Sequence, residues 1–264
     1  LPDYTAIPGT NFFKESATEL TDMLEGRLEL NIQRAVYLSE HPYLNGSLSY
    51  QRYTEEIQNP VRICSLKMKE EGLSPNDNLA KIMMIFRIIT EEVIVKEPGA
   101  EKELTHYPMK YDFEDYRGRE DKSKSYVSKL LSTKTGQCRS LPLLFLILAE
   151  EMNAEAYLSV SPNHSFIKFK DKSGKWCNVE LTSGALANDD FYMNSGFIKS
   201  QAIKNGIYLS PITKKETIAH LLAETSMFYS HKYGYDSFVK QSLDTSLKHF
   251  PNSIHAHLVY SNYH

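Results

Sequence analysis

Cys138, His164 and Glu180 follow one another along this sequence as a thiol, an imidazole and a carboxylate. These are the parts of nucleophilic acyl transfer, in which a thiolate attacks a carbonyl carbon, an imidazole exchanges the proton, and a carboxylate orients the imidazole ring. No one of the three residue types is diagnostic by itself. The sequence around each residue therefore has to place it where this chemistry would need it.

Cys138 lies where a polar segment meets an apolar one, in "TKTGQCRSLPLLFLILAEEMN" (residues 133–153). The apolar run predicts a buried helix of about four turns that begins near Cys138. Pro142 fits the first turn of such a helix, because proline has no N–H to donate. The unpaired N–H groups and the dipole at a helix start favour thiolate over thiol. The alternative is that Cys138 is a small buried apolar residue, the more frequent fate of a free cysteine.

His164 and Glu180 lie in "AEAYLSVSPNHSFIKFKDKSGKWCNVELTSG", which is rich in β-branched and aromatic residues and predicts a strand, a turn and a hairpin. The two residues have the same parity, and alternate residues of a strand share a face. They stand opposite each other if the residue numbers of each cross-strand pair sum to about 344, which a loop of three or five residues around Lys172 allows. Gly174 would supply the positive φ of a three-residue loop with a bulge.

This register divides the hairpin between two faces. We expect one face to pack on the core, with Cys177 as a core residue, and the other to carry His164 and Glu180. The core face would hold Ser165, Ile167, Phe169, Cys177, Val179 and Leu181, and the opposite face His164, Phe166, Trp176, Asn178 and Glu180.

These motifs resemble the core of the transglutaminase-like superfamily, papain-type enzymes that carry Gly-x-Cys on a helix, then His, then Trp-x-x-Val-Asp on the following strands. The resemblance covers residues 108–184 and is greatest to the bacterial branch with flanking helices and tetratricopeptide-like repeats. It implies that Cys138 is the nucleophile and His164 the general base. Glu180 stands where the family has its orienting Asp, and Trp176 matches the tryptophan before that acid.

The resemblance leaves two roles open. Asn178 is the alternative residue for orienting the imidazole, since papain-type enzymes also use an amide. The backbone N–H of Cys138 would form part of an oxyanion hole. Gln137, Tyr111 and Tyr116 are candidates for its second donor.

The remaining chain is predicted to be mainly helical, which gives an α+β fold with a papain/transglutaminase-like core. We expect an N-terminal helical region at 1–97, the core at 98–210 and a C-terminal helical segment at 211–264. Helical periodicity covers Ser16–Tyr37, Thr54–Glu71, broken early by Pro60, and Asn76–Val95. From Lys214 onward the helices resemble one tetratricopeptide repeat, with an ordinary helical hairpin as the alternative.

Composition excludes several classes of protein. The 264 residues include 30 Lys and Arg against 33 Asp and Glu, a net charge of −3 that argues against nucleic-acid binding. The longest apolar stretch, Leu141–Ala149, is too short to cross a bilayer. The three cysteines form no disulfide framework and have no zinc-site spacing. We therefore expect no metal and no cofactor, and we interpret the acidic run "YDFEDYRGRED" as a solvated surface rather than a calcium loop.

Three functions remain. The first is a cysteine-dependent enzyme, either a hydrolase or protease or a transglutaminase-like acyltransferase, acting on a peptide or protein. The second is a catalytically weak or inactive binding module that holds a peptide in the cleft or a protein partner through the C-terminal helices. A third, a helical scaffold with an incidental cysteine, requires His164 and Glu180 on opposite sheet faces. The sequence starts at Leu1 rather than Met, which favours an extracytoplasmic location.

Overall fold

The computed structural model describes residues 7–97, 99, 102–116 and 120–263. The chain folds into two compact units, and its mixture of helices with small sheets makes it an α+β protein. The first unit consists of Leu1–Tyr50, Lys204–Ile207 and Ile212–His264, and the second of Gln51–Ile203 and Tyr208–Pro211.

This division differs from the one predicted from the sequence. The first two helices of the chain belong with the C-terminal helices, whereas the predicted limits at residues 97 and 210 put them in separate regions. Sequence periodicity finds helices but does not reveal which of them pack together. Three of the predicted limits, residues 1, 98 and 264, lie outside the described residues.

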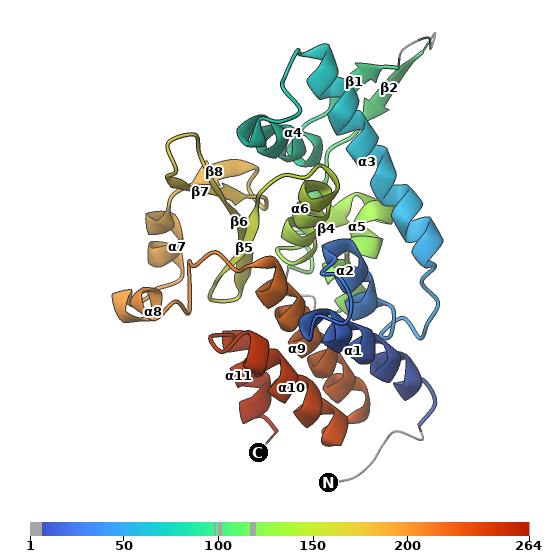
Figure 1. The fold of residues 1–264 in the computed structure, drawn as a ribbon, viewed down its shortest axis with the longest axis vertical. Helices are drawn as coiled ribbons and strands as arrows, with labels where there is room; N and C mark the ends of the chain where they lie inside the picture. The colour runs from blue at the N-terminus through green and yellow to red at the C-terminus, as the bar shows by residue number, and fades with distance from the viewer. Residues whose placement is uncertain (1–6, 98, 100–101, 117–119, 264) are drawn as a thin grey trace. The chain divides into compact units, whose positions relative to one another are not determined.

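The first unit is a bundle of helices arranged around α9, which contacts each of the others (Figure 1). The side chains that α9 buries include Ile218, Leu221, Leu222 and Tyr229. The helices are α1 (Thr10–Leu24), α2 (Ile32–Glu40), α9 (Lys214–Tyr233), α10 (Ser237–His249) and α11 (Ile254–Ser261).

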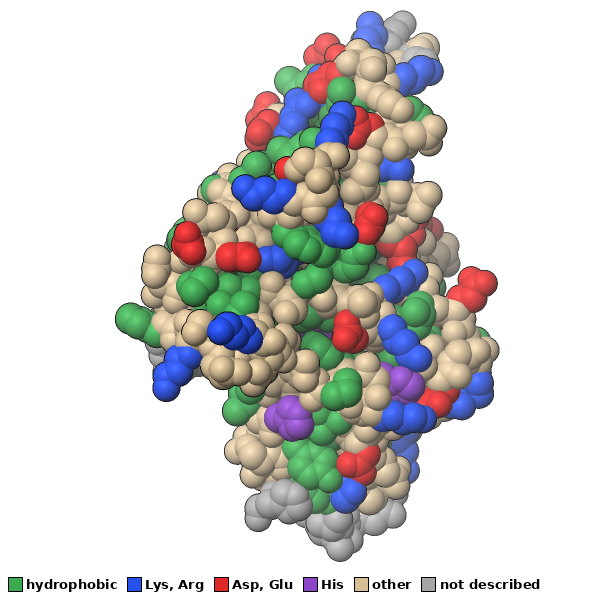
Figure 2. All heavy atoms as spheres, turned by 60° about the vertical axis from the view of Figure 1, so that its left-hand side comes forward, with side chains coloured by type: hydrophobic (Ala, Val, Ile, Leu, Met, Phe, Trp, Pro, Cys, Tyr) green, Lys and Arg blue, Asp and Glu red, His purple; other side chains and the backbone are tan. Residues whose placement is uncertain are grey.

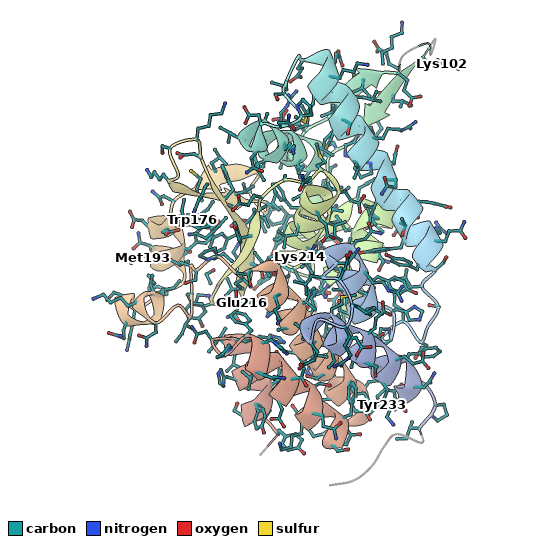
Figure 3. All side chains as sticks on the ribbon, viewed as in Figure 1. Lys102, Trp176, Met193, Lys214, Glu216 and Tyr233 are labelled. Carbon is teal, nitrogen blue, oxygen red and sulfur yellow. The ribbon has the colours of Figure 1, made fainter. Side chains whose placement is uncertain are left out.

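The C-terminal helices begin and end at residues suited to those positions. Thr213 and Glu216 form a reciprocal capping box at the start of α9, where Figure 3 labels Glu216, and Gly234, at φ 91°, ends that helix. Asp236 caps α10 and also accepts a hydrogen bond of 2.6 Å from the Tyr229 hydroxyl. The segment contains the three helices expected from the sequence, an arrangement that both a tetratricopeptide-like repeat and an ordinary helical hairpin would have.

The periodic segment Ser16–Tyr37 is not one helix. It is divided between α1 and α2, and Gly26, at φ 76°, lies in the turn between them. The apolar spacing alone does not distinguish a continuous helix from two helices that bury neighbouring faces.

The second unit contains all the strands that the structure describes. Its helices are α3 (Tyr50–Glu70), α4 (Asn78–Thr90), the 3₁₀ helix η1 (Lys122–Ser125), α5 (Val127–Thr133), α6 (Ser140–Glu151), α7 (Asp189–Ser195) and α8 (Ser200–Lys204). Its strands are β1 (Val93–Lys96), β2 (Glu103–His106), β3 (Lys110–Tyr111), β4 (Thr135–Gly136), β5 (Tyr157–Ser161), β6 (His164–Lys170), β7 (Trp176–Glu180) and β8 (Ala185–Ala187).

Two helix limits predicted from the sequence are wrong. Helix α3 continues through Pro60, which is buried, although proline removes the hydrogen bond to the carbonyl of Glu56. Helix α4 ends at Thr90, and Val93–Lys96 pairs with β2 as a strand instead of extending that helix. Valine and isoleucine in this segment suit a strand as well as a helix.

A four-stranded antiparallel sheet, in the order β5-β6-β7-β8, carries the hairpin predicted from the sequence. Helix α6 lies on one side of this sheet and α7 on the other (Figure 1). Ile167, Phe169 and Val179 are buried, as expected for the core face. The opposite face is also covered, because Phe166, Tyr192, Ile198 and Leu209 form a second apolar cluster against which Met193 of α7 packs (Figure 3).

The surface has charges of both signs. Figure 2 shows basic and acidic side chains interspersed on the face that it presents, in keeping with the small net charge of −3. Among the described helices, none combines the length and the apolar character that a membrane span requires.

Candidate active site

Cys138 lies two residues before α6, in the turn that leads into that helix. The backbone N–H of Leu141 donates to the Gln137 carbonyl over 3.1 Å, so the helical hydrogen bonds begin one residue before the cysteine. The Ser140 hydroxyl accepts the N–H of Gln137 over 2.9 Å, which is half of a capping box. Gly136 makes this cap possible, because a Cβ atom there would lie 2.5 Å from the Ser140 oxygen. The predicted position of Cys138 near the helix start is confirmed.

His164 begins β6 directly after a two-residue turn. Ser161 and His164 are paired across the turn, which is made of Pro162 and Asn163. Asn163 has φ 57°, a left-handed conformation that asparagine adopts more readily than most residues. The Cys138 Sγ atom lies 3.9 Å from the Asn163 carbonyl oxygen. The turn therefore brings the thiol and the imidazole into the same place.

Glu180, at the end of β7, binds His164. The Nε2 atom of His164 and the Oε2 atom of Glu180 lie 2.6 Å apart. The other carboxylate oxygen accepts two hydrogen bonds from Thr182, one from its backbone N–H at 2.9 Å and one from its hydroxyl at 2.6 Å. Glu180 is 2% exposed. The carboxylate is thus buried and held by bonds at both oxygens.

The strand register differs by one pair from the expected one. Ile167 pairs with Val179, so cross-strand residue numbers sum to 346 rather than 344. The loop has three residues, as one predicted option requires, and Gly174 has φ 84°. The even sum keeps His164 and Glu180 on one face, which excludes the incidental-cysteine reading that needs them on opposite faces. They are diagonal neighbours rather than a directly opposite pair.

The charges of the site stabilise one another. Burial alone would lower the pKa of His164, but hydrogen bonds to Cys138 and Glu180 outweigh it and raise that pKa to about 9. Burial alone would raise the pKa of Glu180, but the bonds from His164 and Thr182 outweigh it and lower that pKa. Because Nε2 is bound to Glu180, Nδ1 is the ring nitrogen left for Cys138. The geometry suits a thiolate–imidazolium pair supported by a buried carboxylate.

Tyr111 is one of the oxyanion-hole candidates, and it lies beside the site. Strand β3 pairs Tyr111 with Gly136, two residues before Cys138. Burial and the negative charges of Cys138 and Glu180 raise the pKa of Tyr111 to about 12, so its hydroxyl stays protonated and can donate. Tyr116 is 53% exposed.

Gln137 is directed away from the oxyanion position. Its side-chain nitrogen donates to the carbonyl of Asp115, and the residue is 4% exposed. Asp112 and Asp115 in turn accept backbone N–H groups of the same loop, the first from Glu114 and Asp115, and the second from Glu120 and Asp121. The carboxylates of this acidic run, predicted to be a solvated surface, therefore organise the loop, and Gln137 fastens it to the site.

Asn178 and Trp176 do not reach the imidazole. The amide of Asn178 donates to Asp189 over 2.8 Å, so the role of orienting His164 falls to Glu180. Trp176 pairs with Lys170, which lies six residues along β6 from His164, a distance of about 20 Å in an extended strand. The indole instead packs edge-on against Tyr157, with ring centroids 5.4 Å apart.

Two residues of the site were not found from the sequence. Thr182 follows Glu180 by two residues and lies within the sequence motif, but its hydroxyl becomes meaningful only when the bond to the carboxylate is seen. Tyr192 stacks near His164 from α7, and no sequence motif marks it. Together with Pro162, Phe191 and Gly196, among others, these residues line a cavity of about 230 Å³ beside the His164–Glu180 pair.

The other two cysteines have different surroundings. Cys64 is fully buried, and burial raises the pKa of its thiol to about 12. Cys177 is half-buried, so the expectation that it is a core residue is wrong. It lies on β7 opposite Phe169, close to the loop that joins β6 to β7, where the sheet is only partly shielded from solvent. Within the described residues, no group of three or more His, Cys, Asp or Glu side chains is arranged to hold a metal ion.

Comparisons with known proteins found one similar solved structure and no matching family. No protein-family model matches the chain, and no curated protein shows significant similarity to it. Among solved structures, the chain is similar to menin, in a crystal structure described as revealing the binding site for Mixed Lineage Leukemia (MLL) protein. The TM-score is 0.43 and the sequence identity 8%, over 95% of this chain and 65% of menin. The chain thus spans less than two thirds of the length of menin.

Proposed function

We propose that this protein is a cysteine-dependent acyl-transfer enzyme that acts on an amide bond of a peptide or protein through Cys138, His164 and Glu180. The proposal includes a transglutaminase-like core in which the turn that leads into α6 carries the nucleophile and the β5–β8 sheet carries its partners. The observation that carries it is the 2.6 Å contact between His164 and a buried, doubly anchored Glu180, beside Cys138, whose Sγ atom lies 3.9 Å from the carbonyl oxygen of the neighbouring Asn163. An incidental cysteine would not need such a supported imidazole.

The reaction follows from the positions of these atoms. The Cys138 thiolate attacks the amide carbon, and the backbone N–H of Cys138, which has no acceptor within its own helix turn, donates to the developing oxyanion. The imidazolium gives its Nδ1 proton to the leaving amine as the C–N bond breaks, which leaves a thioester on Cys138. His164 then takes a proton from the acceptor as it attacks the thioester, and the thiolate leaves.

The acceptor decides the class of reaction. Water as the acceptor gives hydrolysis and a carboxylic acid, whereas an amine gives a new amide. We propose hydrolysis as the default, because water is present at every site open to solvent, and Cys138 is only half-buried. Transamidation would require a pocket that concentrates an amine beside the thioester.

The rate of alkylation of Cys138 by iodoacetamide against pH tests the proposal. The rate is followed on the peptide that contains Cys138, so that Cys64 and Cys177 do not contribute. We expect fast labelling that persists well below the free-thiol pKa of about 8.5. His164→Ala should remove the labelling below that pH. Slow labelling that rises only near the free-thiol pKa, unchanged in His164→Ala, would show that the three residues form no active pair.

That second result would favour the alternative function, a binding module without catalysis. One observation in the first unit supports protein binding: an open groove of about 540 Å³ between α1 and α10. Its walls are mainly polar, with Ala17 and Phe238 as apolar side chains and Lys14, Asp22 and Arg27 as charged ones. The residues along it include Lys14, Ala17, Thr18, Thr21, Phe238, Gln241 and Thr245.

A further inference from the structure

Tyr192 of α7 lies against the ring of His164. The two ring centroids are 6.1 Å apart, and the ring planes differ by 26°. The Tyr192 ring also stacks on Phe166, with centroids 3.8 Å apart and planes within 12°. Tyr192 is 1% exposed and Phe166 is fully buried. The imidazole therefore faces an aromatic wall that is itself packed tightly.

The hydroxyl of Tyr192 lies close to the Glu180 carboxylate. Burial and that facing charge raise the pKa of Tyr192, so the hydroxyl stays protonated. Among the described residues, however, it has no partner at hydrogen-bond distance and angle. The defined contacts of Tyr192 with the site are therefore those of its ring, which stacks on His164 and Phe166.

A polar cluster fixes the first turn of α7 on the sheet. Lys168 Nζ and Asn178 Nδ2 lie 2.6 Å and 2.8 Å from the same carboxylate oxygen of Asp189. Lys168 and Asn178 are a directly opposite pair on β6 and β7, and both are 2% exposed. A lysine buried this deeply needs its carboxylate partner nearby. We call these three residues the lysine lock.

Asp189 of the lysine lock and Tyr192 lie on one side of α7. Asp189 and Tyr192 are three residues apart, a spacing that puts two side chains on the same face of a helix. When the lysine lock holds Asp189 against the sheet, it also turns Tyr192 toward His164. The placement of the Tyr192 ring is therefore determined by an ion pair away from the thiol, in which Lys168 is buried and the Asp189 side chain is 49% exposed.

We propose that α7 is a positioning element for the candidate active site, in which Tyr192 holds the His164 ring against Glu180 and the lysine lock holds Tyr192 in place. This inference rests on the proposed function. Tyr192 is a positioning residue, acting through His164. An imidazole held at one nitrogen can still rotate about its side-chain bonds. The Tyr192 ring, packed against one face of the imidazole, excludes those other rotamers.

The test compares three variants in the full chain. Tyr192→Leu removes the wall, Tyr192→Phe removes only the hydroxyl, and Tyr208→Leu is the matched control. Tyr208 packs partly buried on the same apolar cluster but belongs to segment 208–211 rather than to α7. Two quantities are measured: the iodoacetamide labelling rate of Cys138 at pH 6, and the downfield proton resonance of the His164 Nε2–H, identified by its loss in His164→Ala.

We expect Tyr192→Leu to slow labelling at pH 6 by about 10-fold or more, the effect typical of residues that orient a reactive group. Its Nε2–H resonance should broaden or vanish, because the ring no longer stays bonded to Glu180. Tyr208→Leu should keep both properties, and Tyr192→Phe, which retains the ring, should lose less than Tyr192→Leu. Tyr192→Leu with unchanged labelling and an unchanged resonance would overturn the inference, as would a loss in Tyr192→Phe as large as in Tyr192→Leu.

The two measurements separate the failure of this inference from the failure of the proposed function. If the wild-type protein shows no labelling at pH 6 but its resonance disappears in Tyr192→Leu, the positioning role stands and the enzymatic proposal falls. If wild-type labelling at pH 6 is fast and Tyr192→Leu alters neither quantity, the enzymatic proposal stands and the positioning role falls.

The lysine lock is tested by combining substitutions. Lys168→Met keeps the length of the buried side chain and removes its charge. It should slow labelling about 3-fold in the wild-type background and have no further effect in Tyr192→Leu, because it acts through the ring of Tyr192. Equal effects in both backgrounds would show that Lys168 acts by another route and would overturn this part of the inference.

Discussion

His164 and Glu180 are joined by a 2.6 Å contact although they are not opposite each other in the sheet. The register that pairs Ile167 with Val179 sets Glu180 opposite Phe166, one diagonal step from His164. Diagonal neighbours in an antiparallel pair lie about 7–8 Å apart, farther than opposite ones. A glutamate spans this distance better than the shorter aspartate found in the family that the sequence resembles.

Glu180→Asp should therefore be almost as harmful as Glu180→Gln. The shorter carboxylate cannot keep both its contact with His164 and its bonds from Thr182, so we expect Cys138 labelling at pH 6 to fall by about 10- to 100-fold in either variant. Glu180→Gln serves as the control of equal length without charge. Labelling in Glu180→Asp close to the wild-type rate would show that the diagonal placement does not require the longer side chain.

The His164–Glu180 pair should make stability depend on pH in a defined range. The pKa of His164 is raised from an ordinary 6.5 to about 9, so its contribution is complete below pH 6.5 and is lost as the pH rises through 9. The lowered pKa of Glu180 adds a contribution present above its ordinary value of 4.5 and lost as the pH falls below it. The pair is therefore most stabilising between pH 4.5 and 6.5.

Chemical denaturation of the wild type and His164→Gln at several pH values measures this contribution. The difference in unfolding free energy should be largest near pH 6 and decrease by about 3 kcal/mol by pH 10, the amount that corresponds to the shift in the pKa of His164. Thr133→Ala, on the exposed side of α5, is a control whose effect should not vary with pH. A constant difference for His164→Gln would contradict the coupling of the pair.

Gly136→Ala should disturb the start of α6. The added Cβ would lie 2.5 Å from the Ser140 oxygen and 3.0 Å from a methyl carbon of Leu130, so the cap on Gln137 would open. We expect a loss of about 1–3 kcal/mol in unfolding free energy, together with slower labelling of Cys138. Ser140→Ala, which removes the same cap without a clash, should lose about 1 kcal/mol. Equal stability of Gly136→Ala and the wild type would contradict this account of the turn.

Gln137→Leu distinguishes an oxyanion donor from a loop anchor. Since the Gln137 amide is bonded to the Asp115 carbonyl, we expect this variant to loosen the loop, which limited proteolysis with a protease that cleaves after acidic residues would reveal. Alkylation of Cys138 passes through no oxyanion intermediate, so the labelling rate should change less than 3-fold. Unchanged proteolysis with turnover of an amide substrate reduced by about 100-fold or more would instead assign the oxyanion role to Gln137.

Local sequence signals predicted the elements that carry the site. The polar-to-apolar change at Cys138 located the helix start, and residue parity put His164 and Glu180 on one face. These features depend on neighbours in the chain, such as Pro142, Asn163 and Gly174. The exact register was wrong by one pair because a three-residue loop can be centred on residue 172 or 173 with equal parity.

Features that depend on distant contacts were not predictable in this way. Asn178 was a reasonable partner for His164, because the two residues share a face of the sheet. Its amide instead donates to Asp189 of α7, which the sequence does not place nearby. Tyr192 has no sequence signal, since its role comes from stacking with Phe166 and His164. The pairing of α1 and α2 with α9 likewise leaves no local trace, because amphipathic helices show which face is buried but not against what.

The first unit has a consequence for how the protein is made. Helices α1 and α2 are synthesised before the whole second unit, yet the helix on which they pack, α9, follows that unit in the chain. Phe13, Leu20 and Val36, which the finished fold buries completely, lack the surface of α9 until then. On the ribosome, the residues of the second unit emerge before α9, so α1 and α2 keep apolar side chains exposed until α9 follows, which makes that interval prone to aggregation.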